Sequence, residues 1–238
     1  AWEDASGEAF IDAVALAPGG TGLALGDPLD GCFVLRTEDS GRSWERLPPS
    51  ALPAVELGES SFAASGTCLA RLGDSGFCFV TGGSRARFHS TIDGRSWRSV
   101  DLPLAAGLPS RGAFSVAARG RRLCVAGGDY AEPTRGEATA AYSEDGGTDW
   151  NLAERGPGAY CSCVAWAPAE LERSAVIPPL VAVGTEGCFA SLDGGRTWEP
   201  FSREPFHAVA FFPESPDGVA RGLVVGAGGR VAIIRLGP

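Results

Sequence analysis

Four copies of one turn motif divide this chain, and they constrain its fold more than any other feature. The motif reads Ser/Thr-x-Asp-x-Gly-x-Ser/Thr-Trp, and the copies at 37–44 and 191–198 keep every position. The copy at 143–150 has Asp149 where a hydroxyl is expected, and the copy at 91–97 is one residue short. Successive copies lie about 50 residues apart, a period that is typical of β-propellers built from four-stranded blades.

The residue types of the motif indicate a structural role. The Asp carboxylate can accept backbone N–H bonds across a tight turn, and the Gly supplies a positive φ. The hydroxyl can bond locally to the backbone, and the Trp opens the next strand with a large apolar surface. We therefore expect hairpin turns, and not catalysis or Ca²⁺ binding, from the repeated residues Asp39, Gly41, Trp44, Asp93, Gly94, Trp97, Asp145, Gly147, Trp150, Asp193, Gly195 and Trp198.

Five repeat units can be aligned along the 238 residues. In four of them the second strand is short and ends at a glycine before a polar loop, at Gly26, Gly127, Gly184 and Gly226. We predict one all-β propeller domain over residues 1–238, with four-stranded antiparallel blades near 8–47, 61–102, 113–153, 159–201 and 206–236.

The last unit lacks a fourth strand. Residues 1–5, which contain Trp2, are predicted to supply it and so close the ring without exposed edges. The alternative is that the five blades are a fragment of a seven-bladed ring.

Composition excludes several classes of function. The net charge of −9 and the lack of a basic patch argue against nucleic-acid binding. No apolar run approaches the ~20 residues that a membrane helix needs. The seven cysteines are scattered and odd in number, so we expect buried free thiols, with a disulfide left open. No metal site and no cofactor is expected.

The motif resembles the Asp-box, or bacterial neuraminidase repeat, which is found in sialidases and in many non-enzymatic propellers. The stretches 27–31, 62–68, 125–130 and 181–185 further resemble bacterial proteins related to the photosystem II stability/assembly factor, sialidase-like propellers often labelled "oxidoreductase". This resemblance covers nearly the whole chain from Phe10 onward. It implies a seven-bladed relative, a secreted or periplasmic location (lumenal in a photosynthetic host), and an assembly role with a protein partner.

In such a propeller, the loops between second and third strands and the connections between blades share one face. We expect a partner-binding or ligand-binding surface of mixed charge there. Its candidate residues are Asp27, Asp30, Arg85, Arg87, Asp129, Tyr130, Arg135, Glu186, His207 and Arg230.

A sialidase-like glycoside hydrolase is the alternative function. A sialidase requires three arginines that clamp a carboxylate, together with a tyrosine nucleophile and a glutamate. Arg85, Arg135 and Arg230 could converge for this purpose, with Tyr130 and Glu186 nearby. The Arg-Ile-Pro motif of sialidases is absent, and the two histidines, His89 and His207, form no pattern with a serine and a carboxylate.

The favoured hypothesis is therefore a non-catalytic binding or assembly scaffold with no predicted catalytic residue. Its partner is expected to be a protein or a small polar or carbohydrate ligand, and the chain is expected to be a monomer.

Overall fold

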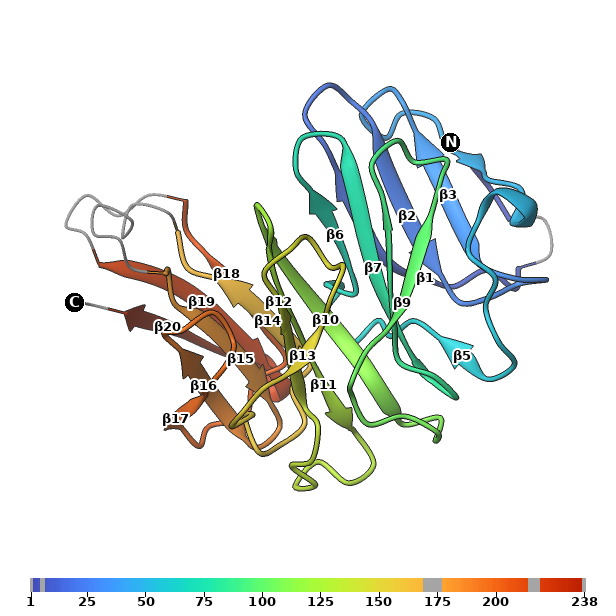
Figure 1. The fold of residues 1–238 in the computed structure, drawn as a ribbon. Coiled ribbons are helices and arrows are strands. Elements are labelled where there is room, and N and C mark those ends of the chain that lie inside the picture. The colour runs from blue at the N-terminus through green and yellow to red at the C-terminus, as the bar shows by residue number, and fades with distance from the viewer. Residues whose placement is uncertain (1, 5–6, 169–176, 214–218, 237–238) are drawn as a thin grey trace.

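The computed structural model describes residues 2–4, 7–168, 177–213 and 219–236, and nearly all of its regular structure is antiparallel strand (Figure 1). Short 3₁₀ turns occur at Pro49–Ala51 and Ala227–Gly229. No helix in this part of the chain is long and apolar enough to cross a membrane. The strands are β1 (Ile11–Leu16), β2 (Gly22–Gly26), β3 (Phe33–Thr37), β4 (Glu45–Arg46), β5 (Glu59–Ser60), β6 (Leu69–Leu72), β7 (Gly76–Gly83), β8 (Arg87–Thr91), β9 (Arg98–Asp101), β10 (Arg111–Arg119), β11 (Arg122–Asp129), β12 (Ala140–Ser143), β13 (Asn151–Leu152), β14 (Cys163–Trp166), β15 (Leu180–Gly184), β16 (Gly187–Ser191), β17 (Glu199–Ser202), β18 (Ala208–Phe211), β19 (Ala220–Gly226) and β20 (Arg230–Leu236).

The strands form consecutive meanders, which we call blades 1 to 5. Blade 1 is β1–β4, blade 2 is β6–β9, blade 3 is β10–β13, blade 4 is β14–β17 and blade 5 is β18–β20. Blades 2 and 3 are joined into one nine-stranded sheet, because Gly82 of β7 pairs with Gly112 of β10 and β5 also pairs with β7. The prediction of separate four-stranded units therefore missed a hydrogen-bonded connection between two of them.

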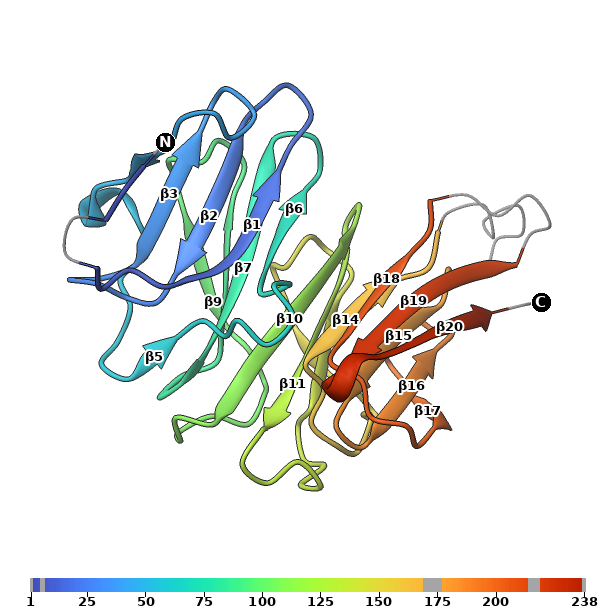
Figure 2. The ribbon, with the colours of Figure 1, turned by 180° about the vertical axis from the view of Figure 1, so that it is seen from behind.

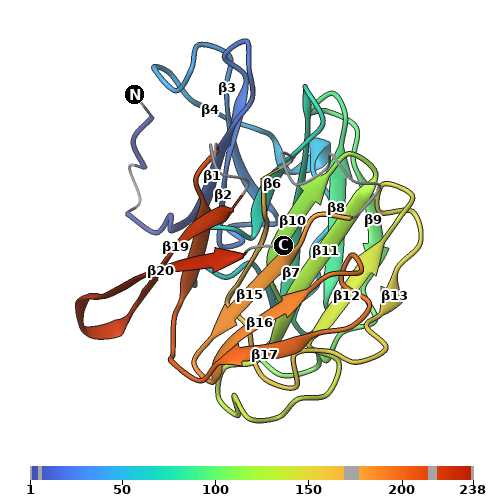
Figure 3. The same cartoon turned by 90° about the vertical axis from the view of Figure 1, so that its left-hand side faces the viewer.

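The blades stand side by side around an arc with their first strands innermost (Figures 1 and 2). Viewed from the blade 5 side, β15–β17 lie across β10–β12, so neighbouring blades pack face to face (Figure 3). These features confirm the predicted all-β propeller architecture.

The predicted closing strand does not form. Blade 5 has three strands within the described residues, and Trp2–Asp4 pair with none of them. Trp2 packs instead against Phe33 of blade 1, with ring centroids 5.6 Å apart, and the two chain ends lie at opposite ends of the arc (Figure 2). Residues 1 and 5 of the predicted strand, and parts of the predicted blades at 169–176 and 214–218, lie outside the described residues.

The repeated turns owe their shape to one hydroxyl and one carboxylate. In the fourth copy, Ser191 Oγ donates to Asp193 Oδ1 at 2.8 Å and accepts the Gly195 N–H at 2.9 Å. Asp193 also accepts the backbone N–H of Thr197, and Trp198 Nε1–H donates to Gly195 O at 3.1 Å. The first and third copies repeat these bonds, so the motif satisfies its own polar groups.

The missing residue of the second turn has a visible consequence. Asp93 still accepts the N–H groups of Arg95 and Ser96. The indole Nε1 of Trp97, however, is buried without a hydrogen-bond partner, whereas the other three tryptophans each reach a glycine carbonyl.

The glycines at or near the ends of the second strands allow close contact with the neighbouring backbone. A Cβ on Gly127 would lie 1.9 Å from Gly112 O, and one on Gly184 would lie 2.0 Å from Tyr160 O. Gly26 and Gly226 face Phe10 O and Pro205 O in the same way, at 2.3 and 2.8 Å. A side chain at these positions would force the first and second strands apart.

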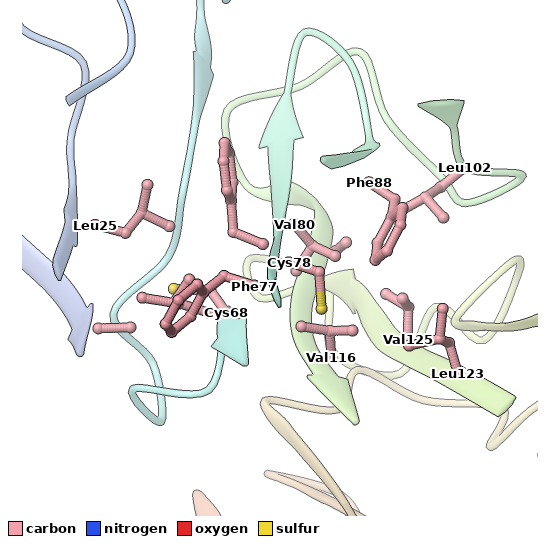
Figure 4. Close-up of a cluster of buried hydrophobic side chains, with 14 of the residues drawn as sticks. Leu25, Cys68, Phe77, Cys78, Val80, Phe88, Leu102, Val116, Leu123 and Val125 are labelled. Atoms are coloured by element: carbon pink, nitrogen blue, oxygen red, sulfur yellow. The ribbon is translucent and has the colours of Figure 1, made fainter. Parts of the chain in front are cut away.

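The core lies between the blades. Leu25, Cys68 and Phe77 pack between blades 1 and 2, while Cys78 and Val116 pack between blades 2 and 3 (Figure 4). All seven cysteines are buried, as predicted, and burial raises the pKa of the Cys78 thiol to about 12. These thiols act as small apolar side chains in the core.

Candidate functional site

The two ends of the arc differ in construction. The turns between first and second strands, and the four repeated turns, lie at one end, which we call the turn face. The loops between second and third strands and the connections between blades lie at the other end, which we call the loop face (bottom of Figure 1). Loop-face segments bond to one another: Tyr130 N–H donates to Ser110 O, and Tyr160 N–H donates to Pro133 O. The loop face is therefore a hydrogen-bonded surface and the natural place for a site.

An aromatic cluster from blades 2, 3 and 4 lies at the centre of this face. Phe62 stacks on Phe114 with centroids 3.9 Å apart, and Tyr160 meets Phe114 edge to face at 4.9 Å. Tyr130 sits edge-on to both phenylalanines, at 6.3 and 6.1 Å, and its side chain is 52% exposed. Burial raises the pKa of the Tyr160 hydroxyl, so that residue stays neutral. Sequence reasoning identified Tyr130 but missed the three rings that support it.

Asp129 and Arg111 flank this cluster as a cross-strand pair. Arg111 Nε–H donates to Asp129 Oδ2 at 2.8 Å, and Ala131 N–H donates to Asp129 Oδ1 at 3.0 Å. Burial acts to raise the pKa of Asp129, but hydrogen bonds from Arg111, Ser110 and the backbone lower it to about 2. Asp129 is only 2% exposed, so it orders the loop that carries Tyr130 and does not offer a free charge.

A second charged group is buried at the edge of blade 2. Glu59 accepts hydrogen bonds from Thr81 Oγ1 at 2.6 Å and Arg87 Nε at 2.9 Å, and its side chain has no exposed surface. Burial acts to raise the pKa of Glu59, but the nearby His89 and hydrogen bonds from Arg87, the Glu56 N–H and Thr81 hold it well below its ordinary value. The predicted site residue Arg87 is thus half of a buried ion pair.

His89 lies between a serine and this glutamate, an arrangement that the sequence analysis did not foresee. His89 Nδ1 is 2.8 Å from Ser99 Oγ, and Nε2 is 3.5 Å from Glu59 Oε1. The imidazole is fully buried and stacked on Phe79 at 4.5 Å, and burial lowers its pKa. A ring enclosed in this way cannot meet a substrate, so we assign it a structural role.

The predicted arginines do not converge. Arg85 pairs with Glu56 and Asp101, while Arg135 pairs with Glu132 at 2.9 Å. Arg230 pairs with Glu204 at 2.6 Å in blade 5. Each of these three guanidiniums is therefore bound to a carboxylate of its own neighbourhood.

Three other predicted residues have separate surroundings. Asp30 is exposed and lies 3.5 Å from Arg46 NH2. Glu186 is an exposed residue between β15 and β16. His207 contributes its backbone, because its N–H donates to Val225 O and its carbonyl accepts from Ser162 Oγ, both at 2.7 Å.

Asp27 combines partial burial with a carboxylate that has no ion pair within the described residues, whereas Glu186 also lacks an ion pair but is exposed. It follows β2 and is half-buried, and burial raises its pKa. Asp12, on the adjacent strand β1, is 7% exposed, and its Oδ2 has no hydrogen-bond partner. Burial and the charge of Asp27 raise the pKa of Asp12 to about 7.

A line of hydroxyls joins the inner strands near the axis. Thr67 Oγ1 lies 2.6 Å from both Ser65 Oγ and Ser115 Oγ, and Ser65 Oγ donates to Ser162 O at 2.7 Å. Ser115 Oγ also accepts the N–H of Val164 at 2.9 Å. These bonds connect the inner strands of blades 3 and 4 with the segment that leads into blade 2. Among the described residues, no cluster of three or more histidine, cysteine or acidic side chains could hold a metal ion.

No family model and no curated protein matches this chain in sequence. Solved structures do resemble its fold. A structure of YCF48 bound to a D1 peptide superposes with a TM-score of 0.60 at 19% identity, covering 94% of this chain and 63% of that one. A GH74 xyloglucanase from Xanthomonas campestris gives a TM-score of 0.60 at 16% identity, covering 96% of this chain and 36% of the enzyme. The NanB sialidase from Streptococcus pneumoniae gives 0.52 at 15% identity, covering 86% and 35%.

The chain therefore has an all-β propeller fold of the sialidase-like kind. It spans less than two thirds of the length of each of these three similar structures. The same fold is present in peptide-bound YCF48, in a xyloglucanase and in a sialidase, so the likeness establishes architecture and not activity.

Proposed function

We propose that this chain is a non-catalytic binding scaffold whose loop face holds a polypeptide segment of a partner protein. The observation that carries the proposal is the half-exposed ring of Tyr130 on its base of Phe62, Phe114 and Tyr160. A tyrosine ring that is held in place by packed aromatic neighbours presents apolar area and a hydroxyl, and it loses little conformational entropy on binding. Such residues are typical of the centre of a protein interface.

Two further observations support this proposal. The charges around the aromatic cluster are already paired within the chain, so the face offers contact area more than free catalytic groups. In addition, the similar propeller YCF48 was solved with a D1 peptide bound, so a peptide is a ligand that this fold can accept. The Asp-box and photosystem II assembly-factor resemblance points the same way and belongs to the proposal.

Selection from a random heptapeptide phage library on the immobilised chain tests the proposal. Peptides retained by the wild-type chain should lose about tenfold or more in affinity on Tyr130→Ala, because removal of an interface aromatic costs on the order of 1–2 kcal/mol or more. Ile92→Ala is the matched control, since Ile92 is 77% exposed on the turn face. Equal losses in both variants, or no selected peptide, would contradict the proposal.

A sialidase-like hydrolase is the second candidate, because a sialidase and a xyloglucanase share the fold. It requires arginines that can be released from their present carboxylate partners to clamp a substrate. Turnover of fluorogenic sialosides or aryl glycosides that is abolished by Arg230→Ala, with the fold intact by circular dichroism, would favour the hydrolase over the scaffold.

A further inference from the structure

Asp12 and Asp27 form a pair of carboxylates that nothing in the described part of the chain neutralises. Asp12 lies on β1 and Asp27 directly after β2, the charge of Asp27 raises the pKa of Asp12, and both carboxylates raise the pKa of the Cys68 thiol. Asp12 Oδ2 is buried and accepts no hydrogen bond. An unpaired buried carboxyl group is costly, and so it needs either a proton or a positive partner.

The position of Asp12 results from a β-bulge. The ladder between β1 and β2 pairs Ile11 with Gly26 and Ala13 with Leu25, so Asp12 is skipped. Bulges commonly redirect a side chain that regular pairing would point elsewhere. Here the redirected group is the buried carboxylate beside Asp27.

A groove of about 520 Å³ opens beside Asp27, between blade 1 and the segment that leads into β5. Pro28, Val55 and Leu57 give it an apolar side, and Leu57 is almost fully exposed at 99%. Two other carboxylates line the groove, but both are already paired: Glu56 with Arg85, and Glu59 with Arg87. Among the carboxylates that line this groove, the one without an ion pair is therefore Asp27, and the buried Asp12 interacts with Asp27 electrostatically without lining the groove.

We propose that this groove receives a lysine or arginine side chain of the partner segment, with the cationic head at Asp27 and Asp12 behind it, and the segment's apolar neighbours on Pro28, Val55 and Leu57. The argument is charge complementarity, since a guanidinium or ammonium supplies the positive charge and the hydrogen-bond donors that both carboxylates lack. A bare Ca²⁺ fits less well because it takes six to eight oxygen ligands. This inference rests on the proposed function and names the chemistry of the segment that the scaffold holds.

Two matched probes test the inference: the peptide acetyl-Leu-Arg-Val-amide and the same peptide with citrulline, a neutral isostere, in place of arginine. Titration followed by the ¹³C carboxyl signals of the wild-type chain should show the arginine peptide shifting Asp12 and Asp27 and binding about tenfold tighter than the citrulline peptide, as expected for loss of a charge-assisted contact. Asp27→Asn should abolish this preference. Asp30→Asn should keep it, because Asp30 lies in the same loop but is exposed and faces Arg46.

Several outcomes would overturn the inference. These are equal affinity for the two peptides, an unchanged preference in Asp27→Asn, carboxyl signals that do not move, or stronger shifts with Ca²⁺ alone. Its failure is distinguishable from failure of the scaffold proposal. Phage peptides that depend on Tyr130 but show no enrichment of lysine or arginine would sustain the scaffold and refute the basic-residue groove.

Discussion

Blades 1 and 3 contain the same backbone irregularity with opposite chemistry. In blade 1 the first two strands skip Asp12, and in blade 3 they skip Phe114. In both blades a glycine of the second strand lies against a carbonyl near the start of the first strand, Gly26 at Phe10 O and Gly127 at Gly112 O. The two blades therefore share the backbone of the bulge, while the side chain at the bulge determines whether an aromatic ring or a carboxylate lies at that position.

The surroundings of the two bulge residues differ accordingly. Phe114 is 1% exposed and contacts three aromatic rings, two of them from neighbouring blades. Asp12 is nearly as buried, its Oδ2 has no hydrogen-bond partner among the described residues, and the nearby charge of Asp27 raises its pKa. The bulge in blade 3 adds a packed aromatic side chain, whereas the bulge in blade 1 buries a carboxyl group that has no positive partner in the described part of the chain. This difference is expected where a binding group is kept although it lowers the stability of the fold.

Removal of the Phe114 side chain should give the largest difference in stability between the two bulges. Phe114→Ala deletes a buried ring and should lower the free energy of unfolding by about 3–5 kcal/mol, because the enclosing rings cannot fully collapse into the cavity. Urea denaturation of Asp12→Ala, the equivalent position of blade 1, provides the control and should show little or no loss near neutral pH. Equal losses would mean that Asp12 stabilises the fold as much as Phe114 does.

The glycines opposite the bulges should respond alike, which tests whether the backbone is shared. Gly127→Ala and Gly26→Ala each place a methyl group against a carbonyl oxygen and should cost about 1–3 kcal/mol by overpacking. Gly127→Ala should cost more, because its Cβ would lie 1.9 Å from the carbonyl oxygen against 2.3 Å at Gly26. The control is Gly156→Ala, where the nearest atom is the side-chain Oγ1 of Thr139 at 3.2 Å. Thermal unfolding that ranks Gly156→Ala as the most damaging would refute the shared constraint.

The smallest expected effect is a change in how the free energy of unfolding varies with pH, and it depends on Asp12. Its pKa is about 7 in the folded chain and 3.8 in the absence of the fold. Between these values the folded chain keeps a proton that the unfolded chain has lost, so stability falls as pH rises through this window. Asp12→Asn should remove a slope of up to about 1.4 kcal/mol per pH unit, and Phe114→Leu should leave that slope in place.

Urea unfolding at several pH values between those two limits measures the difference. Because the other ionisable groups are common to both chains, the wild-type curve minus the Asp12→Asn curve isolates this one carboxyl. Parallel curves would show that Asp12 titrates normally in the folded protein.

The sequence was sufficient for features that depend on local chemistry. The Asp and Gly of each turn were predicted to organise a hairpin, and Asp193 and Gly195 do so through bonds within a few residues of each other. The strand-ending glycines were also visible, although their cause, contact with a carbonyl of another strand, was not. Local pattern is reliable here because the partners are neighbours in sequence.

Features that depend on distant contacts were not predictable. Asp12 was interpreted as one residue of a regular inner strand, since the bulge is defined by the pairing of β1 with β2. The arginines were predicted as a group because they share a face, but Arg85 and Arg230 pair with carboxylates that are distant in sequence. Arg135 pairs with its near neighbour Glu132. The prediction of a closing strand was wrong because Trp2 packs against Phe33 of blade 1, and its segment does not pair with β20.

The paired bulge and glycine have a consequence for how such a chain can grow by gene duplication. A copied unit brings with it first and second strands that already lie close together, through a glycine that admits no side chain. The bulge opposite tolerates a carboxylate in one copy and a phenyl ring in another. One codon per copy can therefore change what the loop face recognises, while the scaffold that presents it is inherited unaltered.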